Sequence, residues 1–303
     1  MSKRRAPEQR GATGPRSGQV AVVGRPNVGK STLVNALVGA RISITSRRPQ
    51  TTRHRIRGIL TTPGAQIVFV DTPGFQTAHR SVLNERMNRA VRASLGGVDA
   101  ILLVVEPSLR DEDRAVLALL PAKVPVVVAV NKVDRLADKT RLLPLLSQIA
   151  ALRDFAAIVP VSAEKRWQLE ELTVELARLM PVGPALYADD DLTDRDERFL
   201  AAEYIREKIF RLLGEELPYA TTVVVDHFVH DGELRRIHAT VLVDKASQRA
   251  IVLGARGERM KEIATAARRD MERLFGGKVF LEVWVRVKSG WAEDERTLAQ
   301  LGY

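Results

Sequence analysis

The sequence GRPNVGKS at residues 24–31 spaces two glycines, a lysine and a hydroxyl side chain in a way that suits binding of a phosphate chain. Gly24 and Gly29 allow the backbone to curl, so that successive N–H groups point at phosphate oxygens. We expect Lys30 to reach the β- and γ-phosphates and the Ser31 hydroxyl to ligate Mg²⁺. The motif predicts a nucleoside triphosphate site but does not select the base. The predicted contacts are Gly24, Arg25, Pro26, Asn27, Val28, Gly29, Lys30, Ser31 and Thr32.

A second motif, NKVD at residues 131–134, selects guanine. The Asp134 carboxylate is expected to accept hydrogen bonds from the N1–H and the exocyclic amine of guanine, a donor pair that adenine lacks. Asn131 is expected to approach the N7/O6 edge, and the Lys132 stem to cover the ring face. In the SAE sequence at residues 162–164, Ser162 and Ala163 complete the predicted contacts, with the Ala163 N–H directed at O6.

A third motif, DTPG at residues 71–74, predicts the end of the site that senses the γ-phosphate. Asp71 is expected to hold Mg²⁺ through water, and the Gly74 N–H to contact the γ-phosphate, with Thr72 and Pro73 also at the nucleotide. In QTTRH (residues 50–54), Thr52 is expected to close over Mg²⁺, with Thr51 as the alternative. The predicted metal ligands are Ser31, Thr52 and Asp71, and the predicted catalytic residues are Lys30, Thr52 and Gly74.

Phe75 follows DTPG, at a position where many regulatory GTPases have a water-orienting glutamine. A phenylalanine cannot orient water, so we expect slow intrinsic hydrolysis. We hypothesise that a partner, or a monovalent cation such as K⁺ held near Asn27, assists the reaction. The alternative for Asn27 is that its side chain only orders the loop.

These motifs must be positioned by the elements around them. Short apolar runs alternate with amphipathic stretches between residues 19 and 180, a pattern typical of a doubly wound α/β domain with helices on both faces of a sheet. The predicted strands are 19–24, 55–60, 65–71, 100–106, 124–130 and 156–162. The predicted helices are 30–38, 81–95, 111–120, 138–152 and 168–180.

The second half of the chain has a different order of elements. Residues 1–18 are interpreted as a flexible basic tail, 19–180 as a GTPase domain, 181–194 as a linker, and 195–303 as a smaller α+β domain with a C-terminal tail. We expect helices at 195–213 and 258–275, and strands at 220–229, 235–244, 249–253 and 278–287.

The GARG sequence at residues 254–257 is a candidate RNA clamp, because a GxxG turn at the start of a helix can hold a single-stranded backbone. Ala255 stands where a basic or polar residue is common, which puts a phosphate contact by that side chain in doubt. The predicted RNA-binding residues are Gly254, Ala255, Arg256, Gly257, Arg259 and Lys261.

Composition narrows the function classes. The chain has 303 residues, 47 lysines and arginines against 37 acidic residues, a net charge of +10, and no cysteine. The charge favours a polyanionic partner such as nucleic acid, anionic lipid or the ribosome. The absence of cysteine excludes disulfides, thiol nucleophiles and thiolate zinc sites, and fits a reducing cytosol. No apolar run approaches the length of a membrane-spanning helix, so we expect a protein that is neither secreted nor integral to a membrane.

Together the motifs resemble one family. Residues 19–180 resemble a Ras-like, translation-factor-class GTPase domain, and GRPNVGKSTLVNAL, ISITSRRPQTTRHRI and VDTPGF are similar to the Era family in particular. ELPYATTV, the GARG turn and VWVRVKSGWAEDE resemble the KH domain of that family. The resemblance implies a GTPase that binds the 3′ end of small-subunit ribosomal RNA and assembles the small ribosomal subunit. It also implies a cytoplasmic location with loose association at the inner face of the membrane. We also expect the protein to use Mg²⁺ and to act as a monomer.

Several interpretations stay open at this stage. Six arginines between residues 41 and 57 are interpreted either as a second RNA-binding surface or as solvated side chains, namely Arg41, Arg47, Arg48, Arg53, Arg55 and Arg57. Trp284 is expected in the core because it alternates with Val283 and Val285. The rival functions are a GTPase acting on a membrane or protein partner, an RNA-binding module with a degenerate nucleotide site, and an ATPase, which NKVD disfavours.

Overall fold

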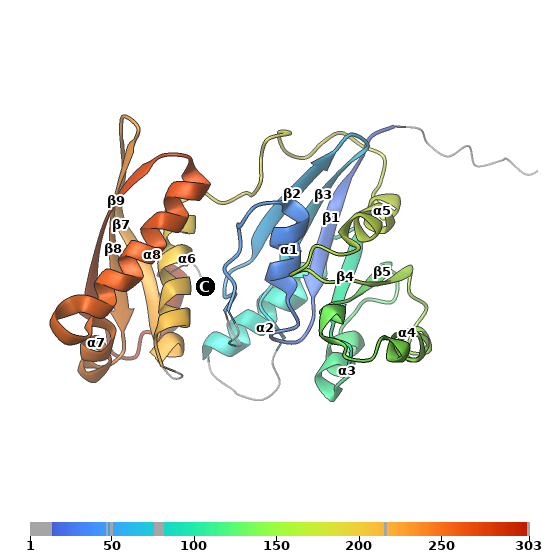
Figure 1. Ribbon diagram of the computed structural model, residues 1–303, viewed down its shortest axis with the longest axis horizontal. Coiled ribbons are helices and arrows are strands. Elements are labelled where there is room, and N and C mark those ends of the chain that lie inside the picture. Colours follow the sequence, from blue (N-terminus) through green and yellow to red (C-terminus); the bar gives the residue numbers. More distant parts are fainter. Residues whose placement is uncertain (1–13, 47, 49–50, 76–81, 215–216, 302–303) are drawn as a thin grey trace, which may run out of the picture.

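The structure is a computed structural model that describes residues 14–46, 48, 51–75, 82–214 and 217–301. Two β-sheets organise the chain (Figure 1). The strands are β1 (Arg16–Val23), β2 (Ile56–Thr62), β3 (Ala65–Asp71), β4 (Ala100–Val105), β5 (Val126–Val130), β6 (Ala157–Pro160), β7 (Thr221–Asp231), β8 (Leu234–Val243) and β9 (Lys278–Val287). The helices are α1 (Lys30–Val38), α2 (Val82–Ser94), α3 (Asp111–Ala118), α4 (Leu142–Ala150), α5 (Leu169–Leu179), α6 (Glu197–Leu212), α7 (Ala246–Leu253), α8 (Glu258–Phe275) and α9 (Glu295–Gln300).

The first sheet has six strands in the order β2-β3-β1-β4-β5-β6, and only β2 runs antiparallel to its neighbour. Its central strands are apolar and buried along their whole length because helices cover both faces. The core on one face includes side chains of α1 and α5, and the core on the other includes side chains of α2, α3 and α4. The predicted doubly wound α/β fold is therefore confirmed.

The second sheet has three strands in the order β7-β8-β9, with β7 antiparallel and β9 parallel to β8. A separate core joins this sheet to α6, α7 and α8. In Figure 1, α6 lies on the side of the second sheet that faces the first domain. This arrangement confirms a smaller α+β unit and brings a helix of that unit next to the first sheet.

The structure corrects the interpretation of residues 249–253 as a strand. They form the C-terminal part of α7, whose start is capped because the Gln248 side chain accepts hydrogen bonds from the backbone N–H groups of Asp244 and Lys245. Five apolar-rich residues are too few to distinguish a strand from a helix by pattern alone. The GARG turn therefore connects two helices, α7 and α8.

Differences at the segment ends are smaller. Strand β1 begins at Arg16, because residues 16–18 pair with β3 although they were expected in the flexible tail. The expected linker pairs with the first sheet, where the Ile59 N–H donates to the Leu192 carbonyl at 3.0 Å and Asp194 forms an ion pair with Arg57 at 2.9 Å. The C-terminal tail contains α9, where Leu298 packs on Leu83 of α2.

Among the described residues, none of the helices combines the length and the apolar character that crossing a bilayer requires.

Candidate nucleotide site and its contact with the second domain

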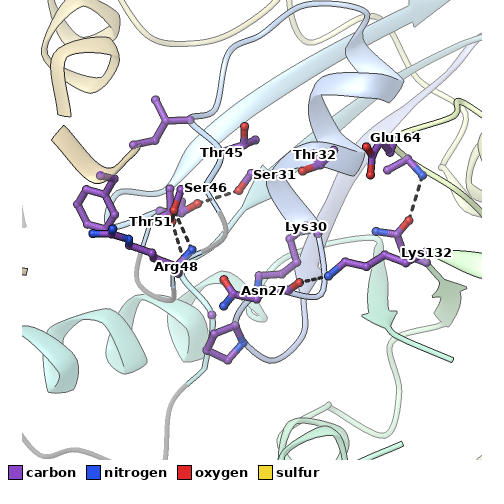
Figure 2. Close-up of a pocket in the computed structure, with 18 of the residues that line it drawn as sticks. Asn27, Lys30, Ser31, Thr32, Thr45, Ser46, Arg48, Thr51, Lys132 and Glu164 are labelled. Carbon is purple, nitrogen blue, oxygen red and sulfur yellow. Dashed lines mark hydrogen bonds between the residues drawn. The ribbon is translucent and has the colours of Figure 1, made fainter. Parts of the chain in front are cut away.

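A cavity of about 980 Å³ opens at the carboxyl end of the first sheet, where the loops after β1, β3, β5 and β6 meet (Figure 2). Of the predicted nucleotide contacts, the structure brings these to its lining: Pro26, Asn27, Gly29, Lys30, Ser31, Thr32, Gly74, Asn131, Lys132, Asp134 and Ala163. Thr52, a predicted metal ligand, also lines it. The other predicted contacts lie behind the lining, namely Gly24, Arg25, Val28, Asp71, Thr72, Pro73 and Ser162. Residues distant in sequence thus share one cavity.

The loop from Gly24 to Lys30 is shaped for an anion. Gly29 has a φ of 98° and ends the loop where α1 begins, so the first N–H groups of this helix face the cavity. A side chain on Gly29 would collide with the Asn131 carboxamide, since a Cβ there would lie 2.4 Å from Asn131 Nδ2. Close packing and backbone conformation therefore both require glycine at this position.

The Lys30 ammonium lies inside this loop and donates hydrogen bonds to the carbonyls of Gly24 at 3.0 Å and Arg25 at 2.9 Å. Burial lowers the pKa of Lys30 to about 8, although the Asp71 carboxylate partly opposes this shift. The charged form is thus costly in the cavity without an anion. A phosphate group would supply the missing negative charge.

Three oxygen-bearing side chains converge where Mg²⁺ was expected. The Ser31 and Thr52 hydroxyls lie 2.8 Å apart, whereas the Thr51 hydroxyl instead donates to the Arg48 carbonyl. Both carboxylate oxygens of Asp71 are buried without a hydrogen-bond partner among the described residues. Burial raises the pKa of the Asp71 carboxyl, and the nearby Ser31 hydroxyl and Lys30 ammonium oppose that rise without cancelling it. Such a set suits Mg²⁺, which prefers oxygen ligands and completes its shell with water and phosphate oxygens.

The DTPG loop lies against the phosphate loop. The Thr72 hydroxyl donates to the Val22 carbonyl at 2.8 Å, which joins the end of β3 to β1. A side chain at Gly74 would collide with Pro26, because a Cβ there would lie 2.8 Å from the Pro26 Cα. Phe75 turns away and packs against the core of α2 and α3, with Arg92 6.0 Å from its ring centroid. Of this loop, Gly74 lines the cavity and lies against the phosphate loop, so its N–H remains the candidate to sense the γ-phosphate.

The base end of the cavity differs from expectation at two residues. The Asn131 side chain donates to the Val28 carbonyl at 2.9 Å and accepts from the Ala163 N–H at 3.0 Å. Both groups were expected to face the guanine N7/O6 edge, but here they join the phosphate loop to the SAE loop. Asp134 is exposed at the cavity, and no hydrogen bond of its carboxylate is formed to other described residues. The group expected to read the base is thus open to a ligand.

The Arg25 side chain points away from the nucleotide cavity. Its guanidinium forms ion pairs with Glu106, at the end of β4, and with Asp113 at 3.2 Å. Glu106 also binds the ammonium of Lys132, which donates in turn to the Asn27 carbonyl, as Figure 2 shows for the Lys132–Asn27 contact. Only the backbone of Arg25 remains placed to serve a phosphate.

Helix α6 of the second domain holds the segment that carries Thr52. The Arg206 guanidinium donates to the Thr51 carbonyl at 2.6 Å while pairing with Glu203, and both side chains are buried. The Glu207 carboxylate accepts from the Thr45 N–H at 3.0 Å. Phe210 and Arg211 of α6 also line the cavity. Sequence reasoning missed these residues, because the charged side chains of α6 carry no sign of their partners, and only the structure shows that Arg206 and Glu207 are buried.

The same contacts correct the interpretation of the arginine-rich segment as an RNA surface or a solvated face. Arg41 pairs with Asp270 at 2.7 Å, Arg48 donates to the Leu213 carbonyl at 2.6 Å, and buried Arg53 donates to the Thr221 carbonyl at 2.9 Å. Arg57 pairs with Asp194, Arg55 is exposed, and Arg47 lies outside the described residues. Four of these arginines therefore join the first domain to the linker or the second domain.

The GARG turn has the backbone of a tight clamp. Gly254, Arg256 and Gly257 have φ values of 71°, 51° and 81°. A side chain on Gly254 would collide with Arg259, 2.6 Å from its Cβ. Ala255, Arg256 and Lys261 are exposed, whereas the Arg259 guanidinium donates to the Leu212 carbonyl at 2.9 Å. The turn thus presents Arg256 and Lys261 outward and ties its flank to the end of α6.

Trp284, within β9, and Trp291, after its end, lie in different environments. Trp284 was expected in the core but is 43% exposed, on the sheet face away from the helices, where it stacks on His238 with ring centroids 5.8 Å apart. Alternation along β9 places Val283 and Val285 inward and Trp284 outward. Trp291 is buried, and its indole N–H donates to the Ala220 carbonyl at 3.1 Å.

Comparison with known proteins agrees with the geometry of both domains. Residues 19–132 match the family model described as 50S ribosome-binding GTPase, and residues 216–292 match the KH domain model. The chain is 53% identical to GTPase Era of Nitrosomonas eutropha, over 96% of this chain and 99% of that protein. It is 57% identical to GTPase Era of Xanthomonas oryzae pv. oryzae, over 95% and 97%.

Two solved structures match with a TM-score of 0.91 and 35% identity, each over 95% of this chain and 99% of the other. One is a single-residue variant of Aquifex aeolicus Era bound to GDP and AlF4⁻. The other is Era in complex with MgGDPNP and nucleotides 1506–1542 of 16S ribosomal RNA.

Proposed function

The chain belongs to the Era family of GTPases, and from that premise we propose that it couples GTP hydrolysis to binding of the 3′-terminal part of small-subunit ribosomal RNA during assembly of the small ribosomal subunit. One observation carries the coupling. Helix α6 touches the Thr52 segment through Arg206 and touches the flank of the GARG turn through the Leu212 carbonyl. A single rigid element therefore connects the nucleotide cavity with the candidate RNA clamp.

Hydrolysis relies on positioning and charge neutralisation. Lys30 and the N–H groups at the start of α1 would hold the β- and γ-phosphates, and Asp134 would accept hydrogen bonds from the guanine edge. Ser31, Thr52 and, through water, Asp71 would hold Mg²⁺, which neutralises charge on the phosphates when bound. The Gly74 N–H would sense the γ-phosphate. Loss of that phosphate would release Gly74 and Thr52, and with them the segment that α6 holds.

A monovalent cation beside the phosphate loop is a further part of the proposal. Asn27 is exposed and lines the cavity, so its side chain is available to a ligand. We propose that K⁺ near Asn27 assists hydrolysis by neutralising charge on the phosphates, because Phe75 cannot orient the attacking water. Single-turnover hydrolysis in potassium should exceed that in sodium at equal ionic strength, and the excess should disappear in Asn27→Ala. Equal wild-type rates in the two salts would refute the potassium proposal.

RNA recognition would use the GARG turn between α7 and α8. Its glycines allow a phosphate backbone to approach closely, and Arg256 and Lys261 offer exposed positive charge. The Era complex with nucleotides 1506–1542 of 16S ribosomal RNA supports this choice of partner.

The decisive experiment measures binding of an RNA containing the 16S 3′ end with the full chain in GDP and in a non-hydrolysable GTP analogue. We expect tighter binding with the analogue. Reversing charge in Arg256→Glu/Lys261→Glu should weaken binding at least about tenfold and reduce its salt dependence. Lys123→Glu/Lys139→Glu, on the first domain, is the matched control for net charge. Equal binding by both double variants would refute the clamp, and equal affinity in the two nucleotides would refute the coupling.

Loose association with an anionic membrane surface and action as a monomer remain part of the proposal. Their support is the family resemblance and, for the membrane, the net charge of +10. Co-sedimentation with vesicles containing anionic lipid should exceed that with neutral vesicles, and light scattering should give the mass of one 33.6 kDa chain. Equal sedimentation, or a mass of two chains, would contradict the respective expectation.

A further inference from the structure

A partly buried cluster of charges lies beside the nucleotide cavity, and one of its members, Glu106, has no role in the function described so far. Glu106 follows β4 and lies between two cations, Arg25 of the phosphate loop and Lys132 of the NKVD motif. The side chains of Glu106 and Lys132 are about one-fifth exposed, and that of Arg25 is 7% exposed. Neither Glu106 nor the Arg25 side chain lines the cavity. Their contribution to binding must therefore act through the residues that they hold.

Lys132 is the residue of the cavity that Glu106 holds in place. Its φ of 66° is a left-handed conformation that costs free energy for a residue with a side chain, so surrounding contacts must maintain it. The Lys132 ammonium donates both to Glu106 and to the carbonyl of Asn27 in the phosphate loop. Glu106 thus fixes the direction of the side chain whose stem is expected to cover the guanine ring.

The two neighbouring cations keep the Glu106 carboxylate ionised. Burial alone would raise its pKa, but hydrogen bonds from Lys132 and Arg25 outweigh burial and hold the pKa below its ordinary value. Without Glu106, Arg25 would keep only Asp113, and Lys132 would keep only a backbone carbonyl among the contacts described. Two cations close together and partly shielded from water would then repel each other.

We infer that Glu106 is a positioning residue that couples the phosphate loop to the base-reading motif, so that a guanine nucleotide held by both dissociates slowly. This inference rests on the proposed nucleotide site. It assigns to Glu106 a selective effect: ligands that contact both the base and the phosphate regions depend on it more than ligands that contact the phosphate region alone.

The test compares two ligands and two variants of the full chain. Tripolyphosphate fills only the phosphate loop, whereas GDP also reaches Asp134 and Lys132. In Glu106→Gln we expect GDP to dissociate about tenfold faster, because breaking a shielded ion pair leaves its partners unpaired. The affinity for GDP should fall at least about fivefold more than the affinity for tripolyphosphate. Asp113→Asn is the matched control, since Asp113 binds the same Arg25 without touching Lys132, and it should affect both ligands alike.

Each outcome decides the inference. An unchanged GDP dissociation rate, or an equal loss for GDP and tripolyphosphate, would overturn it. Should Glu106→Gln lower the melting temperature strongly, Glu106→Asp keeps the charge on a side chain one methylene shorter and should show the same selective loss at smaller size; an absent loss there also overturns the inference. Failure of the wild-type chain to bind GDP would instead refute the proposed nucleotide site.

Discussion

The two halves of the nucleotide cavity are held in different ways. The half that takes phosphates and base is fastened within the first domain, by Asn131 between two loops and by Glu106 between two cations. The half that carries Thr52 is fastened from outside, by Arg206 and Glu207 of α6. The contrast teaches that binding of any guanine nucleotide should depend on the first domain alone, whereas recognition of the γ-phosphate should also depend on the second.

The largest expected effect concerns the half of the cavity that is held within the first domain. Lys30→Met removes the ammonium that would neutralise the β- and γ-phosphates, so we expect kcat/KM for GTP to fall by about a thousandfold. Binding of GDP and of GTP should weaken together, because both place a phosphate beside Lys30. Calorimetry with each nucleotide checks this. A variant that lost affinity for GTP alone would contradict the comparison, since Lys30 would then belong with the half of the cavity that carries Thr52.

Asp134→Asn should reverse the choice of base. The amide oxygen can still accept from the N1–H of either base, but the amide NH2 meets the exocyclic amine of guanine as donor against donor. In xanthine a carbonyl takes the place of that amine, and the amide NH2 can donate to it. We expect the ratio of GTP to XTP affinity to fall by about a hundredfold, with phosphate contacts unchanged. Competition between labelled GTP and unlabelled XTP measures the ratio. Retained selectivity for GTP would show that another group reads the base.

Arg206→Lys tests the half of the cavity that α6 holds. Lysine keeps a positive charge opposite Glu203 but cannot span both Glu203 and the Thr51 carbonyl. We expect about a tenfold lower affinity for a GTP analogue with Mg²⁺ and less than a twofold change for GDP. The matched control is Arg198→Lys, at an exposed position on the same helix, whose guanidinium donates to carbonyls of β7 in the second domain. Equal weakening of both nucleotides by Arg206→Lys would contradict separate fastening.

The smallest expected effect is a pH dependence. Because burial lowers the pKa of Lys30 to about 8 in the chain without nucleotide, an increasing fraction of Lys30 is neutral above that pH. A bound phosphate stabilises the charged form, so binding takes up a proton and affinity falls as pH rises. With a pKa of about 8, the fall between pH 7 and pH 8.5 is about fourfold. Tripolyphosphate should show the same fall as GDP, and a rise in affinity would refute the assignment.

The sequence predicts the first domain better than the second, for a physical reason. GRPNVGKS, NKVD and DTPG act through neighbouring backbone groups, so their spacing indicates the local shape and chemistry. Other contacts join residues that lie tens to more than two hundred positions apart, namely those of Asn131, Arg25 and the arginines of residues 41–57. Neither local pattern nor composition indicates which residues form such pairs. The misassigned helix at 249–253 has the same origin, because its state is decided by a cap at Gln248 and by packing of Val252 rather than by its own pattern.

The connection between the domains has a mechanical consequence. The Gln66 side chain binds backbone groups of Leu186 and Tyr187, Leu192 follows the outer edge of β2, and Arg195 donates to the Arg55 carbonyl. The linker between the domains is thus held against the first domain almost as far as Asp196, the N-cap residue of α6. Because the linker is held up to the start of α6, we expect a rotation of the second domain to pivot near the first turn of that helix. A change in the contacts of α6 with Thr45 and Thr51 would then also change the position of the GARG turn, which is tied to the end of α6.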